Sequence, residues 1–112
     1  MQKIEAYLRP SALEKVHDAL AKVGITGMSI GEVRGFGRQR GHRAVYRGAE
    51  YRVDFVPKIK IEVIVKDDDL DAAKDVIIAT SKTGEVGDGK IFVIPVSDAV
   101  RIRTGEQGDE AL

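Results

Sequence analysis

Cysteine is absent from this chain of 112 residues. Without a thiol there can be no disulfide, no thiolate nucleophile and no zinc–thiolate site. Aromatic residues make up only 5% of the chain, so the stacking platform that single-stranded RNA requires is largely missing. These shortages exclude cysteine chemistry and weaken the case for an RNA-binding protein.

An excess of charge of one sign is also absent, because 18 Lys and Arg residues balance 18 Asp and Glu residues. No overall positive field is therefore available to attract nucleic acid. No stretch approaches membrane-spanning length, and Lys3, Glu5 and Arg9 interrupt the apolar run that a signal peptide needs. We expect a cytoplasmic protein that binds no nucleic acid and is not itself a membrane protein.

The composition that remains, 43% apolar and 32% charged, is typical of soluble globular proteins. A chain of this length suits one domain over residues 1–112. Alternating apolar and polar residues predict a strand from Gln2 to Leu8 and a stronger one from Pro57 to Val65. Two more strands are predicted from Met28 to Phe36 and from Ile91 to Val96.

Two amphipathic helices are predicted between these strands. The first follows Pro10, with Ser11 and Glu14 as a capping box and Gly24 as its end. Its predicted inner face contains Leu13, Val16, Leu20 and Val23. Acidic residues from Asp67 to Asp71 favour the start of the second helix through the helix dipole. Its predicted inner face contains Leu70, Ala73, Val76, Ile77 and Thr80.

The order strand, helix, strand, strand, helix, strand predicts an α+β, ferredoxin-like fold with two helices on one face of an antiparallel sheet. The segment from Gly37 to Asp54 has no sustained period and is expected to be a long loop. Loops of this length inside a small domain are usually functional or disordered. The polar tail from Thr104 onwards is expected to be mobile.

The turn TGEVGDGK matches the first part of a phosphate loop, with Gly84, four residues, Gly89 and Lys90. The match is incomplete, because Ile91 and a strand follow instead of Ser or Thr and a helix. Glycines would let backbone amides approach an anion, and Lys90 would add a charge. A tight helix-to-strand turn that needs glycine explains the same residues equally well.

Arg101 and Arg103 stand two residues apart, so in extended backbone they would project to one side and could hold phosphate oxygens. A solvated basic edge is the competing explanation. The motif RGFG, residues 34–37, resembles the start of an RNA-recognition signature. Arg38, Gln39 and Arg40 follow where that signature needs apolar and aromatic residues.

Other titratable residues do not form a recognisable catalytic or metal site. His17 is expected on the helix surface and His42 in the long loop. The acidic cluster at residues 67–71 lacks the spacing and glycine of a calcium loop. Because no nucleophile is paired with a base, we expect no conventional active site.

The segments GFGRQRGH, VYRGAEYRVDFVPK, TGEVGDGKIFV and VRIRTGE resemble signature segments of the PII nitrogen-regulatory family. The resemblance runs through nearly the whole chain. It implies a homotrimer that binds ATP or ADP in clefts between subunits together with 2-oxoglutarate. The same resemblance implies a regulatory protein with at most slow incidental ATP hydrolysis. It also implies a T-loop at about 37–55 that contacts targets, a B-loop at about 82–90 and a C-terminal segment at 98–112.

The resemblance assigns nucleotide contacts by motif. Phosphates would meet the B-loop and three arginines, namely Gly87, Asp88, Gly89, Lys90, Arg38, Arg101 and Arg103. Ribose and base would meet Ser29, Glu62 and Ile64, where the family more often has threonine and valine at the first and last positions. Gln39 would complete the coordination of Mg²⁺, and 2-oxoglutarate would meet Gly37, Gln39, Gly41 and Lys58.

The resemblance also suggests partners. Tyr51 corresponds to the tyrosine that some members uridylylate or adenylylate, whereas Ala49 replaces the serine that others phosphorylate. Arg47 matches an arginine that plugs ammonium channels in some relatives. An ammonium transporter, nitrogen-assimilation enzymes and a nucleotidylyltransferase are therefore the expected partners, the first of which would recruit the protein to a membrane.

Overall fold

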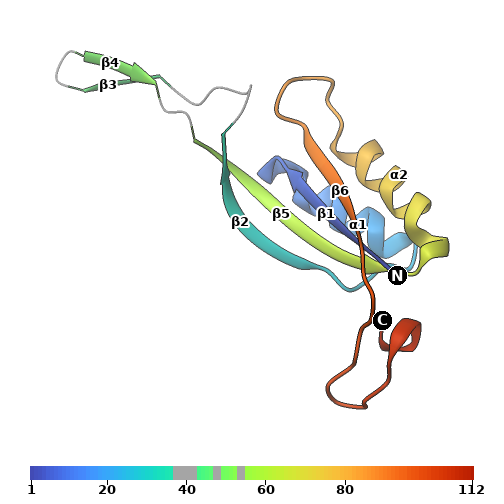
Figure 1. Ribbon diagram of the computed structural model, residues 1–112. Coiled ribbons are helices and arrows are strands. Elements are labelled where there is room, and N and C mark those ends of the chain that lie inside the picture. The colour runs from blue at the N-terminus through green and yellow to red at the C-terminus, as the bar shows by residue number, and fades with distance from the viewer. Residues whose placement is uncertain (37–42, 47–48, 53–54) are drawn as a thin grey trace.

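The computed structural model of the chain describes residues 1–36, 43–46, 49–52 and 55–112. Four strands form an antiparallel sheet in the order β2-β5-β1-β6 (Figure 1). The strands are β1 (Gln2–Leu8), β2 (Ser29–Gly35), β5 (Val56–Val65) and β6 (Gly89–Pro95). With the helices α1 (Leu13–Lys22) and α2 (Leu70–Ser81), they form the predicted ferredoxin-like fold.

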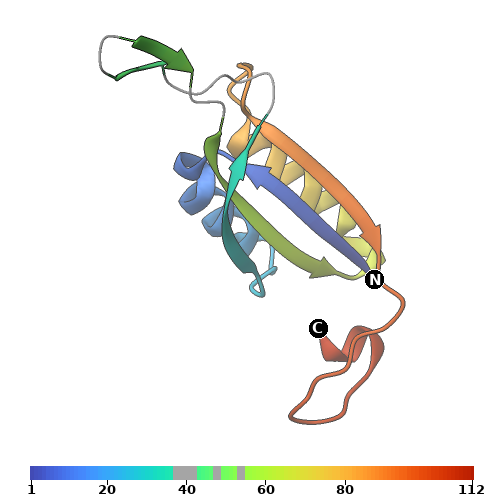
Figure 2. The ribbon, with the colours of Figure 1, turned by 60° about the vertical axis from the view of Figure 1, so that its left-hand side comes forward.

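Both helices cover the same face of the sheet, and the opposite face is left open (Figure 2). The strands β1 and β5 alternate buried and partly exposed residues along their length, as their sequence pattern predicts. Burial of their apolar side chains against the helices is the main force that holds the two layers together. The buried residues are Ile4, Ala6, Leu8, Ala12, Val16, Leu20, Ile59, Ile61, Val63, Val65, Ala73 and Ile77.

The beginning of α1 differs from the prediction. A 3-10 turn, Pro10–Ala12, precedes the helix, and no side chain caps either element. The predicted capping box of Ser11 and Glu14 is therefore wrong. Proline has the backbone angle of a first helical residue, so the chain has already turned before it reaches Ser11.

The end of α1 lies where it is predicted. Gly24 has a φ of 87°. Its amide donates to the carbonyl of Ala21 at 3.0 Å, and the amide of Ile25 donates to the carbonyl of Leu20 at 3.0 Å. This is a Schellman motif, which favours glycine at the left-handed position. Val23, predicted on the inner face, is 48% exposed because it lies in this cap.

The acidic cluster links α2 to the N-terminus. Asp67 lies in a 3-10 turn, Asp67–Asp69, ahead of the helix, while Asp71 is in the first helical turn. One Asp67 oxygen lies 2.9 Å from the N-terminal ammonium and accepts a hydrogen bond from Gln2 at 3.2 Å. The ammonium lowers the pKa of Asp67. Of the predicted inner residues of α2, Ala73 and Ile77 are fully buried.

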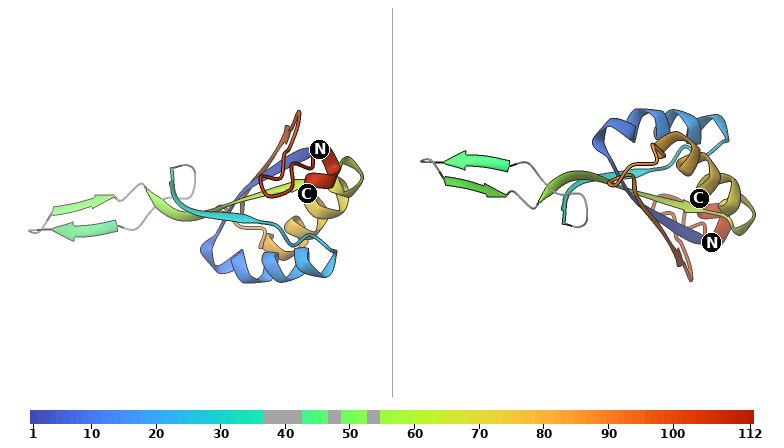
Figure 3. Two further views of the ribbon diagram at one scale, coloured as in Figure 1. Left: turned by 90° about the horizontal axis from the view of Figure 1, so that it is seen from below. Right: turned by 90° about the horizontal axis from the view of Figure 1, so that it is seen from above.

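The segment that we expected to lack regular structure contains a second sheet. Strands β3 (Arg43–Tyr46) and β4 (Ala49–Arg52) pair antiparallel, with Ala44 opposite Tyr51. Figure 3 shows them projecting beyond the ends of β2 and β5. Strands of four residues are too short for a sequence period to reveal them. In the described part of the chain, no helix has the length and hydropathy needed to span a membrane.

Candidate functional site

The open face of the sheet brings together residues from all four strands. Directly paired residues of antiparallel strands point to the same face, so the register defines rows across the sheet. One row contains Ser29, Glu62, Glu5 and Phe92, and the next contains Gly31, Lys60, Tyr7 and Lys90. Ile64 lies in a neighbouring row, opposite Lys3. Ser29, Glu62, Ile64 and Lys90, all predicted nucleotide contacts, therefore share this face.

Glu62 is held in its charged form on this face. Its carboxylate accepts a hydrogen bond from Lys3 at 3.2 Å and lies 3.2 Å from the Lys60 ammonium. The hydrogen bonds from Lys60 and then Lys3 lower the pKa of Glu62. Two lysines thus fix a carboxylate that can still accept a hydrogen bond from a ligand hydroxyl.

Tyr7 forms the aromatic part of the same face. Its hydroxyl donates to Glu5 at 2.8 Å, and its ring packs edge-on against Phe92 with 6.0 Å between centroids. The hydrogen bond from Tyr7 is the main cause of the lowered pKa of Glu5. The open face therefore combines charged groups with apolar surface, as a binding surface for a molecule of mixed character requires.

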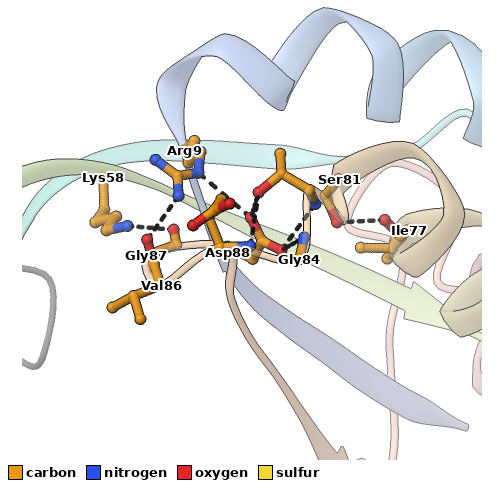
Figure 4. A network of polar contacts seen from close by, with 10 residues as sticks. Arg9, Lys58, Ile77, Ser81, Gly84, Val86, Gly87 and Asp88 are labelled. Carbon is orange, nitrogen blue, oxygen red and sulfur yellow. Dashed lines mark hydrogen bonds and ion pairs between the residues drawn. The ribbon is translucent and has the colours of Figure 1, made fainter.

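The B-loop, residues 82–90, joins α2 to β6 and is organised by Asp88 (Figure 4). One oxygen of Asp88 accepts the amides of Thr83 and Gly84, each at 2.8 Å, and the other accepts the Thr83 hydroxyl. These hydrogen bonds, with the Thr83 hydroxyl foremost, lower the pKa of Asp88 to about 2. The carboxylate is thus negative at neutral pH and contacts its own loop.

Two cations hold the other side of the B-loop. Arg9 Nη2 donates to the carbonyl of Val86 at 2.7 Å, and Arg9 Nε lies 3.4 Å from Asp88 Oδ1. Lys58 Nζ donates to the next carbonyl, that of Gly87, at 2.6 Å (Figure 4). Burial, and next the nearby Arg9, lower the pKa of Lys58. Lys58 therefore reaches the B-loop from the base of the T-loop.

Gly89 allows β6 to approach β1. Its φ is 105°, and a Cβ atom added there would lie 1.7 Å from the carbonyl oxygen of Tyr7. The turn interpretation therefore explains this glycine without a ligand. Gly84 also has a positive φ, of 87°, but no atom lies within 4 Å of its added Cβ. The chain continues from Gly89 as a strand, so the topology is that of a turn and differs from a true phosphate loop.

A small pocket of about 230 Å³ lies between the end of α2 and the start of β6. Its walls combine apolar side chains with two lysines and a hydroxyl. The lining residues are Leu8, Ile78, Ser81, Lys82, Asp88, Gly89, Lys90 and Ile91. Because the ionised carboxylate of Asp88 also lines it, the pocket is a largely apolar recess beside the B-loop that carries charges of both signs.

The C-terminal segment, which contains Arg101 and Arg103, leaves β6 at the end opposite to the B-loop (Figure 1). The seven residues of β6 span roughly 20 Å, so the structure does not bring Arg103 and Lys90 of one chain together. The backbone turns after Arg101, whose carbonyl accepts the Gly105 amide at 2.8 Å. Our premise of extended backbone from Arg101 to Arg103 is therefore wrong.

The C-terminal tail is ordered by hydrogen bonds, contrary to expectation. Arg101 Nη1 donates to Glu106 Oε1 at 2.7 Å. The Gly108 amide donates to the carbonyl of Ala99 at 2.9 Å, ahead of a 3-10 turn, Gly108–Ala111. Composition could not predict these contacts, because it does not show which residues of the tail pair with one another.

Several predicted residues lie outside the described part of the chain: Gly37, Arg38, Gln39, Gly41, His42 and Arg47. Tyr51 lies in β4, where the backbone alone is described. His17 lies on the surface of α1, as predicted, with its ring 3.2 Å from Asp18. The site also contains residues that we did not predict, namely Lys3, Glu5, Tyr7, Arg9, Lys60, Thr83 and Phe92. Pro10, which restricts the backbone of Arg9, was a visible signal for one of them.

The described part of the chain combines a ferredoxin-like sheet that has an open polar face with a glycine loop held by two cations and a projecting hairpin. Residues 1–106 match the family model described as Nitrogen regulatory protein P-II. The chain is 58% identical to Nitrogen regulatory protein P-II 1 of Escherichia coli (strain K12), with 100% of both chains covered. It is 55% identical, with the same coverage, to Nitrogen regulatory protein P-II of Haemophilus influenzae. The chain belongs to the nitrogen regulatory protein P-II family.

Proposed function

We propose that this protein senses ATP or ADP together with 2-oxoglutarate and regulates proteins of nitrogen metabolism through its T-loop. The observation that carries the proposal is that Ser29, Glu62 and Lys90, from three strands, share the open face beside the B-loop. Ser29 and Glu62 would contact the ribose and Ile64 the base, while Gly87 to Lys90 would contact the phosphates. The protein is then a regulator and no enzyme.

The B-loop fits a phosphate chain in two respects. Gly87 and Gly89 present backbone without a side chain, and the exposed Lys90 supplies a positive charge. Asp88, which would repel phosphate, is directed at Thr83, Gly84 and Arg9. The loop can therefore accept an anion although it contains a carboxylate.

A second copy would complete the nucleotide site. Arg101 and Arg103 lie too far from Lys90 within one chain, so they would reach the phosphates of a nucleotide bound to a neighbouring copy. A homotrimer, in which each chain gives its B-loop to one site and its arginines to the next, meets this requirement. The open face of the sheet, which includes the exposed Phe92 and Ile94, is available for such packing.

The proposed 2-oxoglutarate site centres on Lys58, which would exchange its bond to the Gly87 carbonyl for a carboxylate. Gln39, with Gly37 and Gly41, would hold Mg²⁺ and the acid from the T-loop. Mg²⁺ would supply the positive charge that an acid and phosphates need when they lie together. Because Lys58 lies at the base of the T-loop and contacts the B-loop, binding of the effector to Lys58 would act directly on the nucleotide site.

The T-loop would report the bound ligands to partners. The β3–β4 hairpin projects from the body of the protein, which suits a segment that is read by other proteins. Arg47 would contact an ammonium transporter, and Tyr51 would be the site of nucleotidylylation. Nitrogen-assimilation enzymes and a nucleotidylyltransferase are the other proposed partners.

Lys90→Ala and Arg103→Ala should each weaken ATP binding by roughly 1.5–3 kcal/mol, because each removes a charge-assisted hydrogen bond to phosphate. Isothermal titration calorimetry with ATP and with ADP measures the change. Lys15→Ala, on the exposed side of α1, removes the same charge elsewhere and should leave affinity unchanged. Unaltered ATP affinity in both site variants would contradict the proposed site.

A further inference from the structure

Arg9 has a position in the site that follows from the strand register. Tyr7 pairs with Lys90 and Leu8 with Gly89, so Arg9 is the next residue in line and faces Asp88. Pro10 restricts the residue before it to extended backbone, and Arg9 has φ −62° and ψ 141°. Arg9 therefore continues the direction of β1 past its end, to the B-loop.

The side chain of Arg9 contacts the B-loop at two points. Its Nη2 donates to the Val86 carbonyl at 2.7 Å, while its Nε lies 3.4 Å from Asp88 Oδ1 (Figure 4). The guanidinium is a rigid fork, so two contacts fix the loop more firmly than one flexible ammonium would. Arg9 thus joins the two halves of the B-loop, because Asp88 in turn holds Thr83 and Gly84.

The charge of Asp88 makes this contact important. A carboxylate with a pKa of about 2 is fully ionised at neutral pH. Inside a loop that binds phosphates, an ionised carboxylate opposes the ligand unless a cation lies beside it. Arg9 is that cation. Lys58 contacts the neighbouring Gly87 carbonyl, but it is also the residue assigned to 2-oxoglutarate.

We propose that Arg9 is a positioning residue for nucleotide binding, which holds the B-loop in its anion-binding shape and compensates the charge of Asp88. The inference rests on the proposed nucleotide site. Arg9 acts through the loop and touches no phosphate itself. The two contacts of Arg9 do not involve Lys58, so they can hold the loop while Lys58 turns to a dicarboxylate.

Arg9→Met tests this role, with Lys15→Met on α1 as the control that removes one positive charge from an exposed position. We expect Arg9→Met to weaken ATP binding about tenfold, measured by calorimetry, and to shift the amide resonances of Thr83 and Gly84. Lys15→Met should do neither. Arg9→Lys, which keeps the charge but loses the fork, should weaken ATP binding by about threefold.

A double-mutant cycle with Asp88→Asn separates charge compensation from support of the fold. If Arg9 compensates Asp88, Arg9→Met should cost clearly less ATP affinity when position 88 is neutral. Equal losses in both backgrounds would overturn the charge part of the inference. Should Arg9→Met fail to fold, Arg9→Gln, which is also neutral but keeps a hydrogen-bond donor for the Val86 carbonyl, provides the same comparison.

Different results would contradict the proposed nucleotide binding and the proposed role of Arg9. A wild-type protein that binds neither ATP nor ADP would overturn the proposed function. A wild type that binds ATP, together with an Arg9→Met variant of equal affinity and unshifted Thr83 and Gly84 amides, would overturn only the role of Arg9.

Discussion

2-Oxoglutarate is expected to bind this protein tightly only when ATP and Mg²⁺ are present. Alone, the acid would meet Lys58, whose ammonium is already bonded to the Gly87 carbonyl and whose pKa is lowered by burial. Mg²⁺ with the ATP phosphates would add the positive charge and ligands that complete the site. We expect affinity for the acid to rise about a hundredfold with Mg²⁺ and ATP, and far less with ADP, which lacks the third phosphate.

Reciprocity gives this prediction an internal check. 2-Oxoglutarate must tighten ATP binding by the same factor by which ATP tightens 2-oxoglutarate binding. Gln39→Ala should reduce that factor more than it reduces affinity for ATP alone, because Lys90 and the C-terminal arginines would still hold the phosphates. Gln2→Ala is the matched control, because Gln2 lies at the end of β1 that is farther from the B-loop. Equal affinity for the acid with and without Mg²⁺ and ATP would contradict a shared metal site.

Gly89→Ala should cause the largest loss of stability among single substitutions in the B-loop. The new Cβ would overlap the Tyr7 carbonyl oxygen, at 1.7 Å, and the φ of 105° is strained for alanine. Relief requires β6 to move away from β1. We expect a loss of roughly 3–5 kcal/mol in the free energy of unfolding, which combines backbone strain with a disrupted strand pair.

Gly84→Ala measures the cost of backbone strain without the steric overlap that an added Cβ causes at position 89. Gly84 has a similar φ of 87°, but its added Cβ would meet no atom within 4 Å. Its cost should be about 1 kcal/mol, from backbone strain alone. Urea unfolding of both variants at one protein concentration measures the difference, since the stability of an oligomer depends on concentration. If both variants lost a similar free energy of unfolding, the close approach of β6 to β1 would not be the reason why position 89 needs glycine.

Local patterns were sufficient to predict most of the fold. The predicted alternation of apolar and polar residues in β1 and β5 is confirmed, because one face of each strand is buried under the helices. Gly24 ends α1 because its left-handed backbone is a local requirement. The capping role of Ser11 failed because Pro10 starts the turn one residue earlier, and the β3–β4 hairpin was missed because its strands have four residues each.

The candidate site was predictable only in part, because its contacts join residues far apart in the chain. Glycines and Lys90 mark the B-loop in the sequence, but Arg9 and Lys58 reach it from positions 79 and 29 residues away. Such pairs depend on strand order and register, which the local sequence does not contain. The predicted strand from Ile91 to Val96 already separated Arg103 from the B-loop, but the backbone turn after Arg101 was not predictable from the local pattern.

The central claim is that one nucleotide site uses Lys90 of one copy and Arg103 of another, and subunit mixing tests it most directly. Lys90→Ala and Arg103→Ala proteins would be co-refolded in equal amounts and titrated with ATP, with each variant refolded alone as the control. In a ring of three, every mixed ring has one site with both residues intact, so about a quarter of all sites should regain wild-type affinity. A mixture that binds ATP no better than the separate variants would contradict a site shared between copies.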